Sequence, residues 1–146
     1  MGLDIQAVRQ LVAADRGLAV VATLRDDGGP QASVVNAGVL DHPVTGTPVV
    51  AFVARGDTVK LRNLRARPRV SVTFRAGWHW VTAEGEADLV GPDDPHDRVD
   101  DVGALLRAIF TAAGGTHDDW PTFDRVMAQE RRAAVLVTPD RIYGNP

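Results

Sequence analysis

The chain has 146 residues, a formal net charge of −3 and no cysteine. These values predict a single domain, exclude disulfides, thiolate metal sites and cysteine nucleophiles, and agree with a cytoplasmic location. A hydrophobic share of 45% excludes a disordered chain, and no apolar run approaches the ~20 residues of a membrane span. Asp4, Arg9 and Asp15 interrupt the first residues, so we expect no signal peptide.

In chain order, apolar residues at helical spacing predict a helix over 3–15, and the residues after it have a pattern typical of β-strands. The turn sequence at 26–30 joins the first two strands into a hairpin. Strands are expected at 18–24, 31–40, 49–54, 69–75, 78–90 (with a bulge at Gly85) and 133–137, with 141–143 extending the sheet edge. Further helices are expected at 57–66, 93–114 (after an acidic opening) and 120–131. Six antiparallel strands with short inserted helices predict a mainly β protein, a small barrel that occupies 1–146 as one domain.

The charged residues are unevenly distributed along the chain. Fifteen of the sixteen basic residues are Arg, and Lys60 is the only Lys. Segment 55–75 holds six Arg and Lys60 against one Asp, whereas segment 84–101 holds eight acids and one Arg. Such runs are typical of solvated faces, but the basic run also predicts attraction of an anion.

Lys60 has an unusual place in the helix expected at 57–66. With Asp57 as the N-cap, Lys60 is the third helical residue, where the positive end of the helix dipole disfavours a cation. The conflict disappears if an anion binds the free N–H groups of residues 58–60, with the Thr58 hydroxyl and the Lys60 ammonium completing a phosphate site. The alternative is a Lys whose flexible stem simply reaches solvent.

Other candidate residues carry weaker signals. Trp78 and Trp80 share one face of the strand expected at 78–90, either as core residues or as a wall beside a planar heterocycle. The four His show no metal-ligand spacing, so no metal site is expected. His117-Asp118-Asp119 is interpreted as the N-cap of the helix at 120–131.

Several short motifs follow one another along the chain in a characteristic order. They are Pro30-Gln31-Ala32-Ser33, Lys60-x-x-Asn63-Leu64-x-x-x-Pro68-Arg69-Val70-Ser71-Val72, Trp78-x-Trp80-Val81-x-x-Glu84-Gly85-x-Ala87, Asp119-Trp120 and Ile142-Tyr143-Gly144. Their spacing resembles the pyridoxamine 5′-phosphate oxidase-like split β-barrel superfamily, and more closely its actinobacterial deazaflavin-dependent oxidoreductase branch. The resemblance covers about residues 5–144.

The resemblance implies a six-stranded antiparallel split β-barrel of the FMN-binding type, a homodimer with two cofactor sites between its subunits, and a reductase. Reduced coenzyme F420, a deazaflavin, would transfer hydride to a planar conjugated acceptor such as an enone, quinone, lactone or tetrapyrrole. No catalytic side chain or proton donor is assigned. The implied cofactor contacts are Thr58, Val59 and Lys60 for the phosphate, Asn36 and Val53 for the ring and ribityl chain, Trp78 and Trp80 from the fifth strand, and Arg55 and Arg62 for the polyglutamate tail.

Three departures count against FMN and a vitamin B6 substrate. The FMN-dependent oxidases usually carry Arg where this chain has Val59 and Ser33, and another Arg near the C-terminus, where this chain ends Gly144-Asn145-Pro146. The alternatives are an FMN-dependent pyridoxamine phosphate oxidase-like flavoprotein and a non-catalytic cofactor- or tetrapyrrole-binding protein. A nucleic-acid-binding barrel is disfavoured, because Phe74 is the only aromatic residue in segment 55–75 that could stack on a base.

Overall fold

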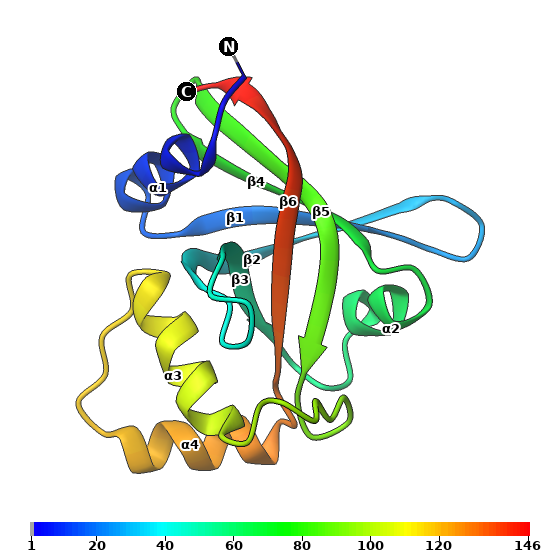
Figure 1. Cartoon of the computed structure of the whole chain (residues 1–146), viewed down its shortest axis with the longest axis vertical. Coiled ribbons are helices and arrows are strands. Elements are labelled where there is room, and N and C mark those ends of the chain that lie inside the picture. The colour runs from blue at the N-terminus through cyan, green and yellow to red at the C-terminus, as the bar shows by residue number, and fades with distance from the viewer. Residues whose placement is uncertain (1) are drawn as a thin grey trace.

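Six antiparallel strands close into one barrel in the computed structural model, which describes residues 2–146 (Figure 1). Neighbouring strands follow the order β1-β2-β3-β6-β5-β4, and pairing of β1 with β4 closes the ring. The strands are β1 (Leu18–Leu24), β2 (Pro30–Asp41), β3 (Pro48–Ala54), β4 (Arg69–Ala76), β5 (His79–Val90) and β6 (Ala133–Asn145). The predicted mainly β fold with six antiparallel strands is therefore confirmed.

The barrel forms because its strands alternate between buried and exposed residues. In β1, Ala19, Val21 and Thr23 face the interior, and the residues between them face outward. The partners of Ala19 and Val21 on β4 are Phe74 and Val72, which are fully buried. Each such apolar side chain contributes about 1.5–3 kcal/mol when it leaves water.

Four helices cover the barrel in two different ways. The helices are α1 (Ile5–Ala14), α2 (Val59–Ala66), α3 (Val102–Ala112) and α4 (Trp120–Gln129). Helices α1 and α2 contribute to the same core as the barrel interior, whereas α3 and α4 build a second core against the outer face of β3 and β6. In Figure 1, α2 lies on the opposite side of the molecule from the loop that joins α3 to α4. No helix within residues 2–146 is long and apolar enough to cross a membrane.

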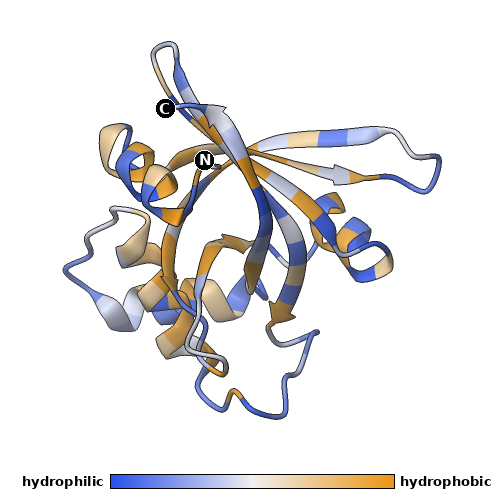
Figure 2. Cartoon of the chain, turned by 45° about the horizontal axis from the view of Figure 1, so that its top comes forward, coloured by the Kyte–Doolittle hydropathy of each residue, from blue (hydrophilic) through white to orange (hydrophobic). Residues whose placement is uncertain are grey.

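Some element boundaries follow the expectations and others do not. Residues 91–101 form a hydrophilic loop, as the acidic opening predicts (Figure 2). The helix after it begins at Val102, and the Asp101 carboxylate caps it by accepting the Ala104 N–H at 2.9 Å. The strand expected at 133–137 continues through 141–143 as the single strand β6. The irregularity predicted at Gly85 is confirmed, since the β5–β6 register shifts between Glu84 and Gly85.

Helix α3 approaches β2 closely at one glycine. A Cβ atom on Gly38 would lie 2.4 Å from the carbonyl carbon of Ala112 and 2.6 Å from the Ala113 amide nitrogen, both backbone atoms. The absence of a side chain at Gly38 therefore lets the C-terminal end of α3 dock directly on the sheet.

We expect Gly38→Ala to lower the free energy of unfolding by about 1–3 kcal/mol, because neither backbone can give way cheaply. Chemical denaturation measures this loss. The matched control is Gly103→Ala in α3, where a Cβ would meet only the Asp101 carboxylate, at 3.4 Å. This control should be neutral or more stable by up to about 1 kcal/mol. Equal effects of the two substitutions would contradict the close approach.

Candidate functional site

A cavity of about 600 Å³ lies between the outer face of the barrel and the helices. This volume falls within the range of sites that hold a cofactor or drug-sized molecule. One wall is formed by β2 and β3, the opposite wall by α3 and α4, and one end by the beginning of α2. The cavity therefore lies where elements from most of the chain converge.

One end of the cavity is strongly basic. Arg55, Lys60 and Arg132 line it, and no carboxylate does. Arg55 pairs with Asp57 at 3.3 Å and Arg132 with Glu130 at 2.9 Å, but Lys60 has no ion-pair partner within residues 2–146. Burial, and then repulsion by the Arg132 guanidinium, lower the pKa of Lys60 below its usual value. The half-buried ammonium thus lacks the counter-charge that would stabilise it.

Helix α2 begins at this basic end without a side-chain cap. The expected N-cap, Asp57, is wrong: Thr58 has the extended backbone of the N-cap, and Lys60 is the second helical residue. The Asp57 carboxylate pairs with Arg55 instead, and the Thr58 hydroxyl donates back to the Arg55 carbonyl at 2.8 Å. The amides of Val59 and Lys60 therefore have no acceptor among residues 2–146, which leaves the positive end of the helix open to an anion.

The remaining walls of the cavity are largely apolar. Val34 and Val53 line it from the barrel, and Phe110, Phe123 and Met127 line it from α3 and α4. A charged contact ties the two helices together, since Arg107 binds both carboxylate oxygens of Asp124, with an Nε–Oδ1 distance of 2.9 Å. A flat ligand with an anionic group fits such a site, because the cavity offers apolar walls and one cationic end.

The cavity brings together five of the residues predicted from the sequence: Asn36, Val53, Arg55, Thr58 and Lys60. The side-chain NH₂ group of Asn36 is already hydrogen-bonded, because it donates to the Arg16 carbonyl at 2.9 Å. That hydrogen bond fixes the Asn36 side chain at the cavity wall and leaves its amide oxygen as an acceptor.

Four predicted residues lie elsewhere in this chain. Val59 and Arg62 line a separate groove beside α2. Trp78 does not belong to β5 but stands in the preceding turn and is 92% exposed. Trp80 lies on the outer face of β5, packed edge-on against Tyr143 at 6.1 Å. Within a single chain, neither Trp lines the cavity.

Sequence reasoning missed the α3–α4 wall of the cavity and Arg132. The apolar residues of these helices have the spacing of a core-facing stripe, and several of them do belong to a core. The helix start predicted at His117-Asp118-Asp119 is confirmed, since Asp119 is the N-cap and accepts the Thr122 N–H at 3.2 Å, but the place of His117 in the cavity wall was not predicted. Hydrogen bonds from Thr122 lower the pKa of Asp119. No periodic signal separates a helix face that lines a cavity from one that fills a core.

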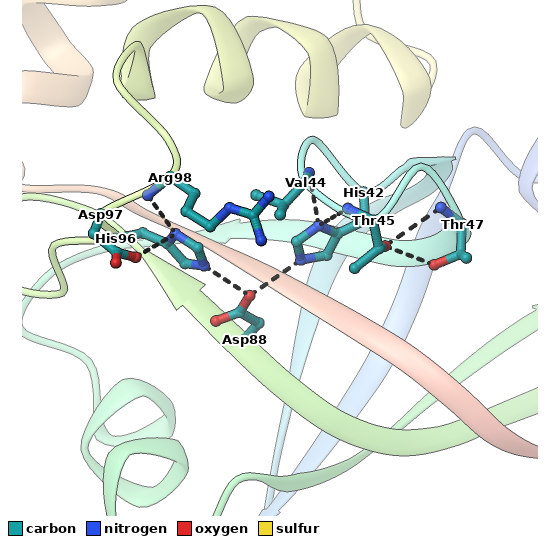
Figure 3. Close-up of polar contacts among 8 residues, drawn as sticks. All are labelled: His42, Val44, Thr45, Thr47, Asp88, His96, Asp97 and Arg98. Carbon is teal, nitrogen blue, oxygen red and sulfur yellow. Dashed lines mark hydrogen bonds and ion pairs between the residues drawn. The ribbon is translucent and has the colours of Figure 1, made fainter.

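A second polar cluster lies away from the cavity, where β5 meets two loops (Figure 3). The buried His42 and the loop residue His96 both direct Nε2 toward Oδ2 of Asp88, at 3.1 and 3.4 Å. Their Nδ1 atoms accept backbone N–H groups, from Val44 and Arg98 respectively. Each Nε2 therefore carries the proton and donates to the carboxylate, which is the wrong tautomer for ligating a metal through that atom. This cluster holds loop 91–101 against the barrel.

The structure is thus a six-stranded barrel with a cavity that has apolar walls and one cationic end. The profile of the pyridoxamine 5′-phosphate oxidase family matches residues 5–145, so the chain belongs to that family.

Solved structures share this fold at low identity. Rv2991, a conserved hypothetical protein from Mycobacterium tuberculosis, is 20% identical, with 98% of this chain and 84% of that one covered and a TM-score of 0.71. An F420 reductase is 20% identical, with 92% and 94% covered and a TM-score of 0.62. An FMN-binding, pyridoxamine 5′-phosphate oxidase-related protein from Nostoc punctiforme is 13% identical, with 97% and 84% covered and a TM-score of 0.63.

We expect His42→Ala to lower the free energy of unfolding by about 1–3 kcal/mol, since it removes a buried acceptor of the Val44 N–H and the donor to Asp88. Urea denaturation provides the measurement. The control, His79→Ala, changes an exposed residue at the start of β5 and should stay within about 0.5 kcal/mol of the unmodified protein. A His42 variant as stable as this control would show that the cluster does not hold the loop.

Proposed function

We propose that the protein is a reductase that binds the deazaflavin coenzyme F420 in this cavity and reduces a planar conjugated small molecule. The observation that carries the proposal is the unpaired Lys60 at the uncapped beginning of α2, in a cavity end with three cations and no carboxylate. Such an arrangement is unfavourable by itself and becomes favourable when a phosphate binds.

The residues present fit the phosphate of such a cofactor. The free amides of Val59 and Lys60 can donate to phosphate oxygens, and the Lys60 ammonium adds a charge-assisted hydrogen bond. The Thr58 hydroxyl already donates to the Arg55 carbonyl, which orients its oxygen and tightens the turn before α2. These residues would hold the anionic end of the cofactor.

The bound deazaflavin supplies hydride from its reduced ring, and the protein supplies position and environment. Val34 and Val53 on the barrel wall and Phe110 and Phe123 on the helical wall would give the cofactor ring an apolar environment. Exclusion of water by these side chains strengthens every electrostatic contact inside the cavity. Asn36 presents its amide oxygen, because its NH₂ group is held by Arg16.

FMN is the second candidate, because it also carries a phosphate and because the family includes FMN-binding proteins. Two features favour the deazaflavin. Ser33 occupies a position where the FMN oxidases carry Arg, and its hydroxyl is buried without a hydrogen-bond partner inside residues 2–146. Arg62 lies in the groove beside α2, which three Arg and two Asp line. Asp26 pairs with Arg67 at 2.8 Å, whereas Arg62 has no ion-pair partner within residues 2–146 and could bind the acidic tail of the larger cofactor.

A homodimer is part of this proposal. Leu18, Val20 and Leu24 of β1 and Val34 of β2 are exposed, and Val20 pairs directly with Val34. This apolar outer face continues into the cavity wall, since Val34 belongs to both. A second copy seated there would bury the face, close the cavity, and bring its own Trp78 and Trp80 to the cofactor.

Lys60→Met tests the phosphate site. We expect a ten- to hundredfold weaker affinity for F420, which is about what losing a charged hydrogen bond costs. Fluorescence titration of the apo protein with F420 and with FMN gives both affinities. The control, Arg9→Met, removes a cation of α1 outside the cavity and should leave both affinities unchanged. Tight binding of FMN alone would overturn the choice of cofactor, and an unchanged Lys60→Met affinity would remove the phosphate site.

The lowered pKa of Lys60 also predicts how the affinity for the cofactor changes with pH. The folded apo protein disfavours the charged Lys, so Lys60→Met should melt at the same temperature or higher. A bound phosphate favours the charged form, and cofactor affinity should therefore fall as pH rises through the lowered pKa. The Lys60→Met variant should lack this alkaline loss. A pH-independent affinity in the unmodified protein would contradict the role of Lys60.

Val34→Glu tests the dimer. We expect analytical ultracentrifugation to give twice the chain mass for the unmodified protein and a single chain mass for the variant, since a charge in an apolar interface loses its hydration. The control, Ala108→Glu, adds the same charge on the exposed surface of α3 and should remain dimeric. A monomeric unmodified protein would contradict the proposed interface.

A further inference from the structure

His117 stands in the loop before α4, is exposed, and lines the mouth of the cavity beside Phe110 of α3 and Phe123 of α4. Its ring stacks on Trp120, with centroids 5.7 Å apart and planes 30° apart. It also meets Phe110 and Phe123 edge-on, at 6.1 and 5.7 Å. The Arg107 guanidinium lies 5.3 Å from the centre of the Trp120 ring and is bound to Asp124, so the residues around His117 are fixed from both helices.

The hydrogen bonds of His117 decide its tautomer. Nδ1 accepts the Asp119 backbone N–H at 3.0 Å. The proton of the neutral ring therefore lies on Nε2, and this N–H has no acceptor inside residues 2–146. The same tautomer excludes a role as a metal or haem-iron ligand through Nε2, since that atom has no free lone pair.

His117 differs from the other donors of the cavity. Lys60, Arg55 and Arg132 gather at the end formed by α2, whereas His117 belongs to the loop on the opposite side of the molecule (Figure 1). An anionic group held by the cations would therefore leave His117 facing the other end of the cavity. Between the two ends, the walls are apolar.

We propose that the Nε2–H of His117 donates a hydrogen bond to the carbonyl oxygen of the hydride acceptor when that acceptor is an enone, one of the classes that the resemblance implies. This inference rests on the proposed function. The hydride brings both electrons and forms a C–H bond at the β-carbon, while the π pair of the C=C bond moves to give an enolate. The negative charge on oxygen is stabilised by the imidazole N–H, and water then protonates the α-carbon. His117 thus acts as an electrophile and keeps its proton.

Three variants test this role. His117→Phe keeps the ring area and loses the donor, and His117→Gln keeps an N–H at a similar reach. His79→Phe, at an exposed position on β5, is the control. With reduced F420 and cyclohex-2-en-1-one, we expect kcat to fall about tenfold to a hundredfold in His117→Phe. The fall should be smaller in His117→Gln and absent in His79→Phe, and the affinity for F420 should be unchanged in all three.

Nitrogen NMR of the histidine rings supplies a readout that needs no turnover. Adding cyclohex-2-en-1-one to the complex with oxidised F420 should shift Nε2 of His117 and leave His42, His79 and His96 in place. An unshifted Nε2, a kcat retained in His117→Phe, or F420 affinity lost in parallel with kcat would each overturn the inference. The F420 titration of the same unmodified sample separates the two proposals: failure to bind F420 removes the proposed function and this inference with it, whereas binding without these effects removes the inference alone.

Discussion

The site depends on how α2 is held in the end of the barrel. Leu61 and Leu64 are completely or almost completely buried in the barrel core, and the amide of the buried Asn63 donates to the Thr23 hydroxyl at 3.1 Å. These contacts stabilise the helix through tertiary packing, so it needs no cap at its beginning. The uncapped beginning of the helix lies at the end of the cavity that Thr58 and Lys60 line, and Lys60 adds a charge without an ion-pair partner within residues 2–146. The same packing that completes the core thus leaves an open, cationic helix start at the surface.

Burial and charge explain why this end of the cavity favours an anionic ligand over water. Lys60 and Arg132 repel one another, and burial deprives Lys60 of hydration, as its lowered pKa reflects. A bound phosphate would offset both the repulsion between the two cations and the lost hydration of Lys60. The opposite wall is apolar, because Phe110 and Phe123 line it, and the Arg107–Asp124 ion pair holds together the two helices that carry these rings. A ligand with one anionic end and one flat apolar end matches both walls, whether its ring is a deazaflavin or a flavin.

Much of the fold could be predicted from the sequence, since alternation in β1 and the turn at 26–30 are local signals. The position of Lys60 in the first turn of a helix was also predictable, and there it conflicts with the helix dipole whether the N-cap is Asp57 or Thr58. The N-cap was predicted wrongly, since Asp57 pairs with Arg55, two residues earlier, instead of capping the helix. The α3–α4 wall was missed because a helix face looks alike whether it fills a core or lines a cavity. Trp78 and Trp80 do not meet the cavity of their own chain, and their predicted role depends on a second copy.

The central claim is that the first turn of α2 binds the phosphate of the cofactor. Amide NMR of the apo protein during titration with F420 tests it most directly. The account predicts that the N–H resonances of Val59 and Lys60 move furthest, as amides do when they donate to a phosphate, and that Lys60→Met reduces both shifts together with the affinity. Saturating binding that leaves these two amides in place, with the largest shifts elsewhere in the barrel, would contradict it.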